Sequence, residues 1–221
     1  TVSLKLKPAA PDDGMEDFTA EWALRSIVKK YSDFVTYPIK LQTTRTETVS
    51  GETGDEDGEE AGSEEPRTHE VKTWETVNSM KAIWTRPQSE VVAAEYNEFY
   101  KHISRDWTDP LLTITLRAEG TFEYNALLFV PERAPFDLFH YDQPWGLQLY
   151  VNRVLIMEQA EELLPRYLRF VKGVVDSPDL SLNVSRELLQ KDRHVSLIRK
   201  RVVRKVIEEL TELQSEDPVS A

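Results

Sequence analysis

The sequence predicts an α/β fold in which helices cover a mixed β-sheet. Segments with alternating apolar residues, typical of half-buried strands, are interleaved with segments whose apolar residues recur every three or four positions, typical of amphipathic helices. Such an interleaved order favours an α/β sandwich. The 221 residues allow one large domain or two modest ones, and the hydrophobic share of 40% is enough for a packed core.

The first third of the chain shows period-two and helical patterns in turn. The predicted elements are a strand over 1–7, a helix over 19–31, a strand over 34–41 and a strand over 69–74. The last two strands would form a hairpin around residues 51–66. Eight acidic and no basic residues lie from Glu52 to Glu65, which leaves a charge of −4 of the total −12 for the rest of the chain. We interpret 51–66 as a flexible, solvated acidic loop rather than a docking site.

The remaining two thirds continue the alternation. Ser89 can cap a helix that ends before Asp109 and Pro110. The later predicted elements are strands over 111–117 and 122–130 joined as a hairpin, a second hairpin over 147–156, short helices over 162–170, a loop over 176–182 and a helical tail over 185–214 with a break near Asp192.

Several classes of function are excluded or disfavoured by residues that are missing from the sequence. The chain has no cysteine, so disulfide scaffolds, thiol catalysis and thiolate metal sites are excluded. It has no glycine-rich phosphate motif, no paired histidines of metalloprotease spacing and no apolar run long enough for a membrane span. We therefore expect no metal site, no membrane partner and a cytoplasmic location. The start at Thr1, within a strand-like stretch, points to a piece of a longer protein.

Two segments carry basic residues that could meet an anion. Residues 193–205 combine cations with an apolar stripe, so a core-packed helix with a solvated basic face is favoured over a nucleic-acid surface. In the second segment, Asn183 or Ser185 can cap a helix whose first turn holds Arg186, with Gln190 one turn later on the same face. Arg186 could form a structural salt bridge, or it could reach the terminal phosphate of a nucleotide bound elsewhere.

Six stretches resemble, in order, the middle segment of the ninety-kilodalton heat-shock chaperones, in the bacterial form of the HtpG family. They are 22–33 (WALRSIVKKYSD), 83–86 (IWTR), 96–110 (YNEFYKHISRDWTDP), 126–139 (ALLFVPERAPFDLF), 147–156 (LQLYVNRVLI) and 164–190 (LPRYLRFVKGVVDSPDLSLNVSRELLQ). The resemblance implies an α/β/α sandwich of the middle-domain type. It also implies these boundaries: 1–8 as the last strand of a nucleotide-binding domain, 9–18 as a linker, 19–213 as the middle domain and 214–221 as a truncated end.

The resemblance further implies an ATP-dependent chaperone. In that family ATP, with Mg, is bound mainly by an N-terminal domain that is absent from this chain, and the full-length protein is a homodimer. Arg186 would contact the γ-phosphate, with Gln190 and Asn183 as its neighbours on the catalytic loop. We expect this segment alone to be inactive as an ATPase.

The family also binds client proteins through exposed aromatic residues. Trp107, Phe139 and Trp145 match its client-facing positions, while Phe136 beside them is expected to lie mostly in the core, and core packing is the competing interpretation for Trp107. The alternative function is a passive protein-binding module with no link to nucleotide.

Overall fold

The computed structural model describes residues 2–6, 17–49, 67–120, 122–135, 138, 144–180 and 192–216. The chain divides into two compact units, each described here by itself. Unit 1 comprises residues 1–29 and 37–78, and unit 2 comprises 30–36 and 79–221. This division falls at other positions than the boundaries expected from the resemblance, which stay predictions.

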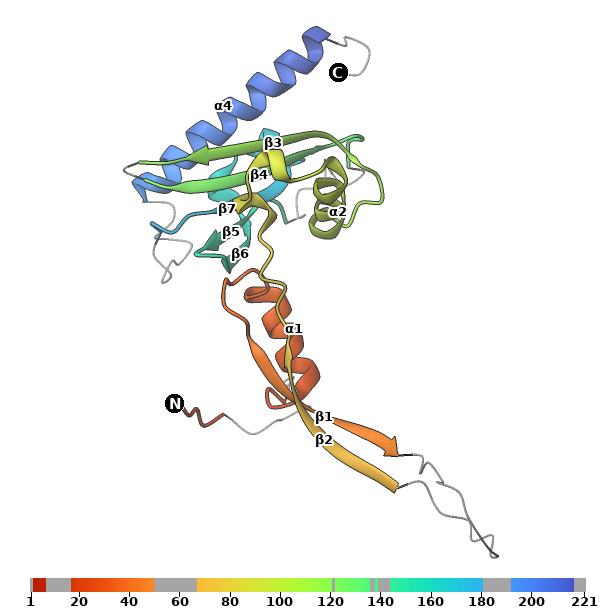
Figure 1. Ribbon diagram of the computed structural model, residues 1–221. Helices are drawn as coiled ribbons and strands as arrows, with labels where there is room; N and C mark the ends of the chain where they lie inside the picture. The colour runs from red at the N-terminus through yellow and green to blue at the C-terminus, as the bar shows by residue number, and fades with distance from the viewer. Residues whose placement is uncertain are drawn as a thin grey trace, which may run out of the picture. The chain divides into compact units, whose positions relative to one another are not determined.

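Unit 1 is built around one helix and one hairpin. The helix α1 (Glu21–Tyr31) confirms the predicted helix, and β1 (Lys40–Val49) pairs antiparallel with β2 (Arg67–Thr76), which confirms a hairpin around the acidic segment. That segment, 51–66, lies outside the described residues. The helix runs beside the hairpin (Figure 1), where the Arg25 guanidinium donates to the Glu75 carboxylate at 2.6 Å.

Two strand predictions in this region differ from the structure. Residues 2–6 form no strand, because no other described segment pairs with their backbone, and Val2 is 87% exposed. The strand expected over 34–41 begins only at Lys40. Phe34 lies instead among aromatic rings of unit 2, with its ring centroid 4.7 Å from that of Trp84. Burial of this ring replaces the strand pairing that its β propensity predicted.

Unit 2 contains a five-stranded sheet, which confirms the predicted α/β class. The strand order is β3-β4-β7-β5-β6, and only β5 and β7 are parallel, so the sheet is mixed. The strands are β3 (Pro110–Ala118), β4 (Tyr124–Pro131), β5 (Leu147–Val151), β6 (Val154–Ala160) and β7 (Lys172–Asp176). Both predicted hairpins are present, as β3–β4 and as β5–β6.

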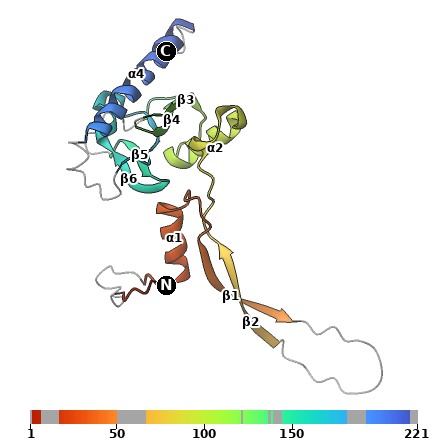
Figure 2. The ribbon, with the colours of Figure 1, turned by 60° about the vertical axis from the view of Figure 1, so that its left-hand side comes forward.

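Helices pack on both faces of this sheet (Figures 1 and 2). Successive residues of β4 point to opposite faces, as strand geometry requires. Leu128 and Val130 join α4 (Arg193–Glu216) in the larger core cluster, whereas Leu127 and Phe129 join α2 (Ala93–Ser104) in the smaller one. Strand β4 is apolar on both faces and contributes to both core clusters, which is why its sequence is a continuous apolar run.

The helices begin near their expected positions, with one wrong cap. Ser89 lies in a 3₁₀ turn, η3 (Gln88–Glu90), and does not cap α2, whose first turn is closed by the Glu95 carboxylate accepting from the Val92 backbone N–H at 3.3 Å. At α4, Asp192 accepts from the His194 backbone N–H at 2.7 Å, and the described helix begins there. Residues 185–191 of the predicted helical tail lie outside the described residues, so the predicted break near Asp192 stays a prediction. Two further 3₁₀ turns, η4 (Glu161–Leu163) and η5 (Arg166–Leu168), match the short helices predicted over 162–170.

The central strand β7 was not predicted from the sequence. Its five residues include Gly173, which interrupts the apolar pattern and lowers strand propensity. Gly173 has a φ of +149°, and a Cβ built there would lie 2.2 Å from the Leu127 carbonyl oxygen. Only glycine allows β4 to approach this closely. Among the described residues, no helix is long and apolar enough to cross a membrane.

Candidate functional site

The segment that carries Arg186 leaves the sheet at the end of β7. Ser177, the first residue after the strand, is fully buried and extends the ladder, because its backbone N–H donates to the Tyr150 carbonyl at 3.1 Å. The Ser177 hydroxyl donates to the Glu123 carbonyl at 2.6 Å. Asp179 accepts from the Glu123 backbone N–H at 2.7 Å, and Leu180 is buried in the larger core cluster. Residues 177–180 are therefore tied to the sheet.

The other end of the same segment is fixed by α4. The Asp192 cap begins the helix, and a stripe of buried residues then packs the helix on the sheet: Val195, Ile198, Val202 and Val206. This confirms the predicted apolar stripe of the 193–205 region. Residues 181–191 join two anchored ends. The predicted catalytic-loop residues Asn183, Arg186 and Gln190 belong to this segment and lie outside the described residues.

A buried carboxyl group stands at the base of this segment. Asp176, the last residue of β7, is 4% exposed. Its Oδ2 accepts from the Trp84 indole N–H at 2.9 Å, and its Oδ1 accepts from the Arg153 backbone N–H at 3.2 Å. Burial, and then the negative charge of Asp176, raises the pKa of the neighbouring Tyr150 hydroxyl.

A second loop presents Trp107 after the end of α2. The helix ends at Arg105, whose φ of 59° is left-handed, and the Asp106 carboxylate then accepts from the backbone N–H groups of Trp107 and Thr108 at 2.7 and 3.2 Å. The buried Tyr100 hydroxyl donates to the same carboxylate at 2.8 Å. Partial burial of Asp106 raises its pKa, but these hydrogen bonds outweigh it and hold the pKa below its ordinary value.

The structure separates the predicted client-facing aromatics. Trp107 is 93% exposed, so the core interpretation of this residue is wrong. Trp145 is half-buried and packs against the larger core cluster, so only part of its ring is available to a partner. Phe136 and Phe139 lie outside the described residues. Only Trp107 is therefore a fully presented aromatic among the described members of this set.

Two basic residues of α4 form ion pairs with acidic residues of the same helix. Arg204 pairs with Glu208 at 2.7 Å and Lys205 with Glu209 at 2.5 Å, each one helical turn apart. Such pairs are typical of a solvated helix face and reduce the positive potential available to nucleic-acid phosphates. This arrangement favours the solvated-face interpretation over a nucleic-acid surface.

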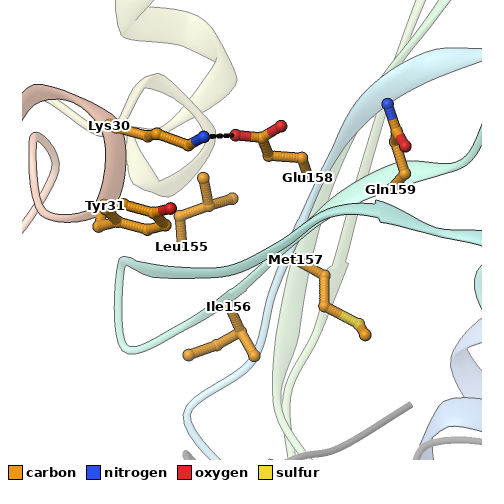
Figure 3. Close-up of a pocket in the computed structure, with 7 residues that line it drawn as sticks. All are labelled: Lys30, Tyr31, Leu155, Ile156, Met157, Glu158 and Gln159. Atoms are coloured by element: carbon orange, nitrogen blue, oxygen red, sulfur yellow. Dashed lines mark ion pairs between the residues drawn. The ribbon is translucent and has the colours of Figure 1, made fainter. Parts of the chain in front are cut away.

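A hollow of about 350 Å³ lies beside β6 (Figure 3). Lys30 and Tyr31 line one side of it and residues 155–159 line the other. The Lys30 ammonium is 2.6 Å from a Glu158 carboxylate oxygen. A triphosphate needs cations and N–H donors that are free to meet it, and here the single lining cation is paired with a carboxylate. The hollow therefore does not fit ATP.

Trp84 and Asp176 were not predicted as site residues from the sequence. Trp84 lies in the quoted stretch IWTR, and Asp176 directly precedes the polar loop that was selected. An acidic residue that directly follows two valines was a usable signal, because such a residue at the end of a buried strand needs hydrogen-bond donors.

Comparisons with known proteins place these features in a family context. The sequence profile described as "Hsp90 protein" matches residues 17–219. The chain is 56% identical over 219 residues to "Chaperone protein HtpG" of Nocardia farcinica, and 52% identical over 218 residues to the protein of that name from Mycobacterium tuberculosis. Each match covers 99% of this chain and 32% of the relative, so the chain spans about a third of the length of these relatives.

Proposed function

The chain belongs to the Hsp90 protein family, and from this membership we propose that it is the middle segment of an ATP-dependent molecular chaperone. The observation that carries the proposal is its 52–56% identity, over 99% of its length, to proteins named chaperone HtpG. The mixed sheet with helices on both faces agrees with a middle domain of α/β/α type. Cytoplasmic location and assembly of the full-length protein as a homodimer are part of the same proposal.

Arg186 would act on ATP, with Mg, that is held mainly by another domain. Its guanidinium would stabilise negative charge on the γ-phosphate as the phosphoryl group is transferred. Asn183 and Gln190 would orient the loop around it. The hydrogen bonds of Ser177 and Asp192, on either side of residues 181–191, support this role, because a catalytic charge is most effective where the flanking backbone is already fixed.

The exposed Trp107 would contribute to a surface for unfolded or partly folded client proteins. An indole on a fixed loop offers a large apolar contact area at low entropic cost, since the carboxylate of Asp106 already orders the loop. Trp145, with part of its ring exposed, and Phe139 would extend the same client surface.

The test of ATP coupling is the Arg186→Ala substitution in the full-length protein, with ATP turnover and ATP affinity measured on the same preparation. We expect turnover to fall by about 10³–10⁵-fold if phosphoryl transfer limits the cycle and by roughly 10–100-fold if closure of the protein limits it, with little change in ATP affinity. Arg201→Ala is the matched control, since Arg201 is an exposed arginine on α4. Full turnover of the Arg186 variant would refute the coupling.

The competing function is a passive protein-binding module without nucleotide coupling. The 93% exposure of Trp107 is the observation in its favour, because an exposed indole serves binding with or without ATP. It predicts that Trp107→Ala weakens client capture while Arg186→Ala changes neither capture nor turnover. The two substitutions, measured together, separate the two functions.

A further inference from the structure

Strand β3 forms one border of the five-stranded sheet (Figure 1). It runs from Pro110 to Ala118, and β4 is the only strand that pairs with it among the described residues. In an antiparallel pair, every second residue directs its backbone N–H and C=O away from the partner strand. The side of β3 that faces away from β4, its outer edge, therefore carries a row of backbone donors and acceptors.

The outer edge of β3 has few of the features that protect edge strands from further pairing. Such features include bulges, prolines inside the strand and charged side chains, above all lysines. The register of β3 with β4 is continuous over 112–118, and the single proline is the first residue of the strand. The one charged side chain, Arg117, pairs with Glu119 at 2.8 Å. The opposite border of the sheet, β6, differs, because its register with β5 is interrupted.

The two faces of β3 differ in polarity. The apolar side chains of one face belong to the larger core cluster or pack against it: Leu112, Ile114, Leu116 and Ala118. Thr113 and Arg117, which alternate with them, are exposed. Ile114 is buried, whereas the other three apolar side chains are only half-buried. A strand added at the outer edge would cover them if its own apolar residues lay on the same face.

Helix α4, which packs against β3, leaves further apolar surface open. Val203 and Leu210 are only partly buried against the larger core cluster, and Ile207 between them is 44% exposed. The apolar layer between helix and sheet is thus incompletely covered. Apolar side chains placed beside β3 would remove more of this layer from water, which favours binding.

The exposed Trp107 stands close to the start of the same edge. It precedes Pro110 by three residues, so the Cα atoms of the two residues lie within about 11 Å of each other. The Asp106 carboxylate holds the backbone of this loop by accepting from the Trp107 N–H at 2.7 Å. A segment paired along β3 can therefore reach a fixed, exposed indole at one end.

We propose that the outer edge of β3 binds an extended segment of a client polypeptide as an added strand, with Trp107 as an apolar anchor at its end. Backbone pairing suits many different clients, because every residue offers a C=O and every residue except proline an N–H. The two faces of β3 favour a segment in which apolar and polar residues alternate and charges are few. This inference rests on the proposed client binding by Trp107 and deepens it.

The test measures binding of three labelled peptides to the 221-residue chain by fluorescence anisotropy. The parent peptide has about ten residues, close to the length of β3, with alternating valine and threonine and a lysine at each end. The second peptide is N-methylated at every valine and the third at every threonine, so each lacks the N–H donors of one edge. We expect one of these two to bind at least about tenfold more weakly than the parent, and the other to bind like the parent.

The peptide series distinguishes backbone pairing from contact between side chains. Equal affinities of the two N-methylated peptides would overturn the inference, because pairing with one edge must discriminate between them. Absence of binding by the parent peptide would also overturn it.

Amide hydrogen exchange of the same chain locates the bound peptide. With the parent peptide at saturation, we expect every second amide over 112–118 to exchange at least about tenfold more slowly, while the amides of β6 keep their rates. Unchanged exchange in β3 would overturn the inference. Slower exchange in β3 without peptide, as the protein concentration rises, would identify a second copy of the chain as the occupant and would also overturn it.

Trp107→Ala separates this inference from the proposed function on which it rests. We expect this variant to bind the parent peptide about tenfold more weakly. Trp74→Ala is the matched control, because Trp74 is an exposed indole on β2. Weaker binding by Trp107→Ala together with equal affinities of the N-methylated peptides would refute the edge pairing alone. Unchanged binding by Trp107→Ala would refute the proposed client role of Trp107, and its role as anchor with it.

Discussion

Substitution of Gly173 by alanine is the sharpest test of how the central strand is built. Gly173 lies in β7 directly opposite Leu128 of β4. The added Cβ would lie 2.2 Å from the Leu127 carbonyl oxygen and 2.8 Å from the Leu128 Cα. These neighbours are backbone atoms of a buried strand, so a side-chain rotation cannot relieve the contact. Strand β4 would have to move away from β7.

The expected cost follows from two terms. A non-glycine residue held at a φ of +149° carries strain of about 1–3 kcal/mol. Separation of the strands weakens about two ladder hydrogen bonds, at about 1 kcal/mol each. The total is about 3–5 kcal/mol, which corresponds to a fall in Tm of roughly 6–20 °C for a unit of this size.

Thermal unfolding followed by near-ultraviolet circular dichroism would measure this loss, because the packed rings of Trp84 and Tyr150, with centroids 5.0 Å apart, report on the tertiary packing of unit 2. Gly120→Ala is the matched control, since Gly120 also has a positive φ, of +123°, but a Cβ there meets nothing within 4 Å. Its cost should be limited to the backbone strain. Equal losses of Tm for the two variants would refute the close-approach argument for Gly173.

Three further predictions concern the exposed tryptophan, its carboxylate support and the α4 core. Trp107→Ala should change the free energy of unfolding by less than about 0.5 kcal/mol yet weaken binding of an unfolded model protein; a Tm loss of several degrees would contradict the exposed placement. Asp106→Asn should lower the free energy of unfolding at neutral pH. The difference in stability between the variant and the wild type should shrink as pH falls below about 4, because the lowered pKa of Asp106 stabilises the fold only while the carboxylate is ionised. A difference in urea midpoint that stays constant from pH 3 to 7 would contradict this prediction. Ile198→Ala, at a fully buried position, should cost about 2–5 kcal/mol, whereas Leu197→Ala next to it, 48% exposed, should cost well under 1 kcal/mol; equal urea midpoints would refute the assigned face of α4.

The parts of the fold that the sequence predicted are those with local signals. The β3–β4 hairpin has a polar turn containing Gly120, and the β5–β6 hairpin turns at Asn152 and Arg153, which both adopt positive φ. Strands joined by such turns need no distant partner to be recognised. The stripe on α4 was equally visible, because its spacing follows the helical repeat.

The parts that sequence reasoning missed depend on distant partners. Strand β7 is short and holds a glycine, and only its place between β4 and β5 makes it a strand. Phe34 has a strand-like context, yet packing against Trp84 removes it from the predicted strand.

Trp107 lies in a recognisable stretch of sequence, and its exposure agrees with the expectation drawn from that stretch. The role of Arg186 stays a prediction, because residues 181–191 lie outside the described residues. The bond of Trp84 to Asp176 joins residues 92 positions apart, so no local pattern could predict it.

The Trp107 loop and the end of β7 are stabilised in the same way, by a carboxylate that accepts hydrogen bonds from an aromatic side chain and from the backbone. At Trp107, the Asp106 carboxylate accepts from a tyrosine hydroxyl and from the loop's own amides; at the base of the Arg186 segment, Asp176 accepts from a tryptophan N–H and from a backbone amide. In each case an aromatic donor anchored in the core fixes a carboxylate, and the carboxylate fixes the backbone. The core thus fixes the backbone that presents Trp107 and the backbone at the end of β7. Loss of the Tyr100 hydroxyl should therefore impair binding through the Trp107 loop more than the stability of the sheet, which distinguishes this arrangement from simple core packing.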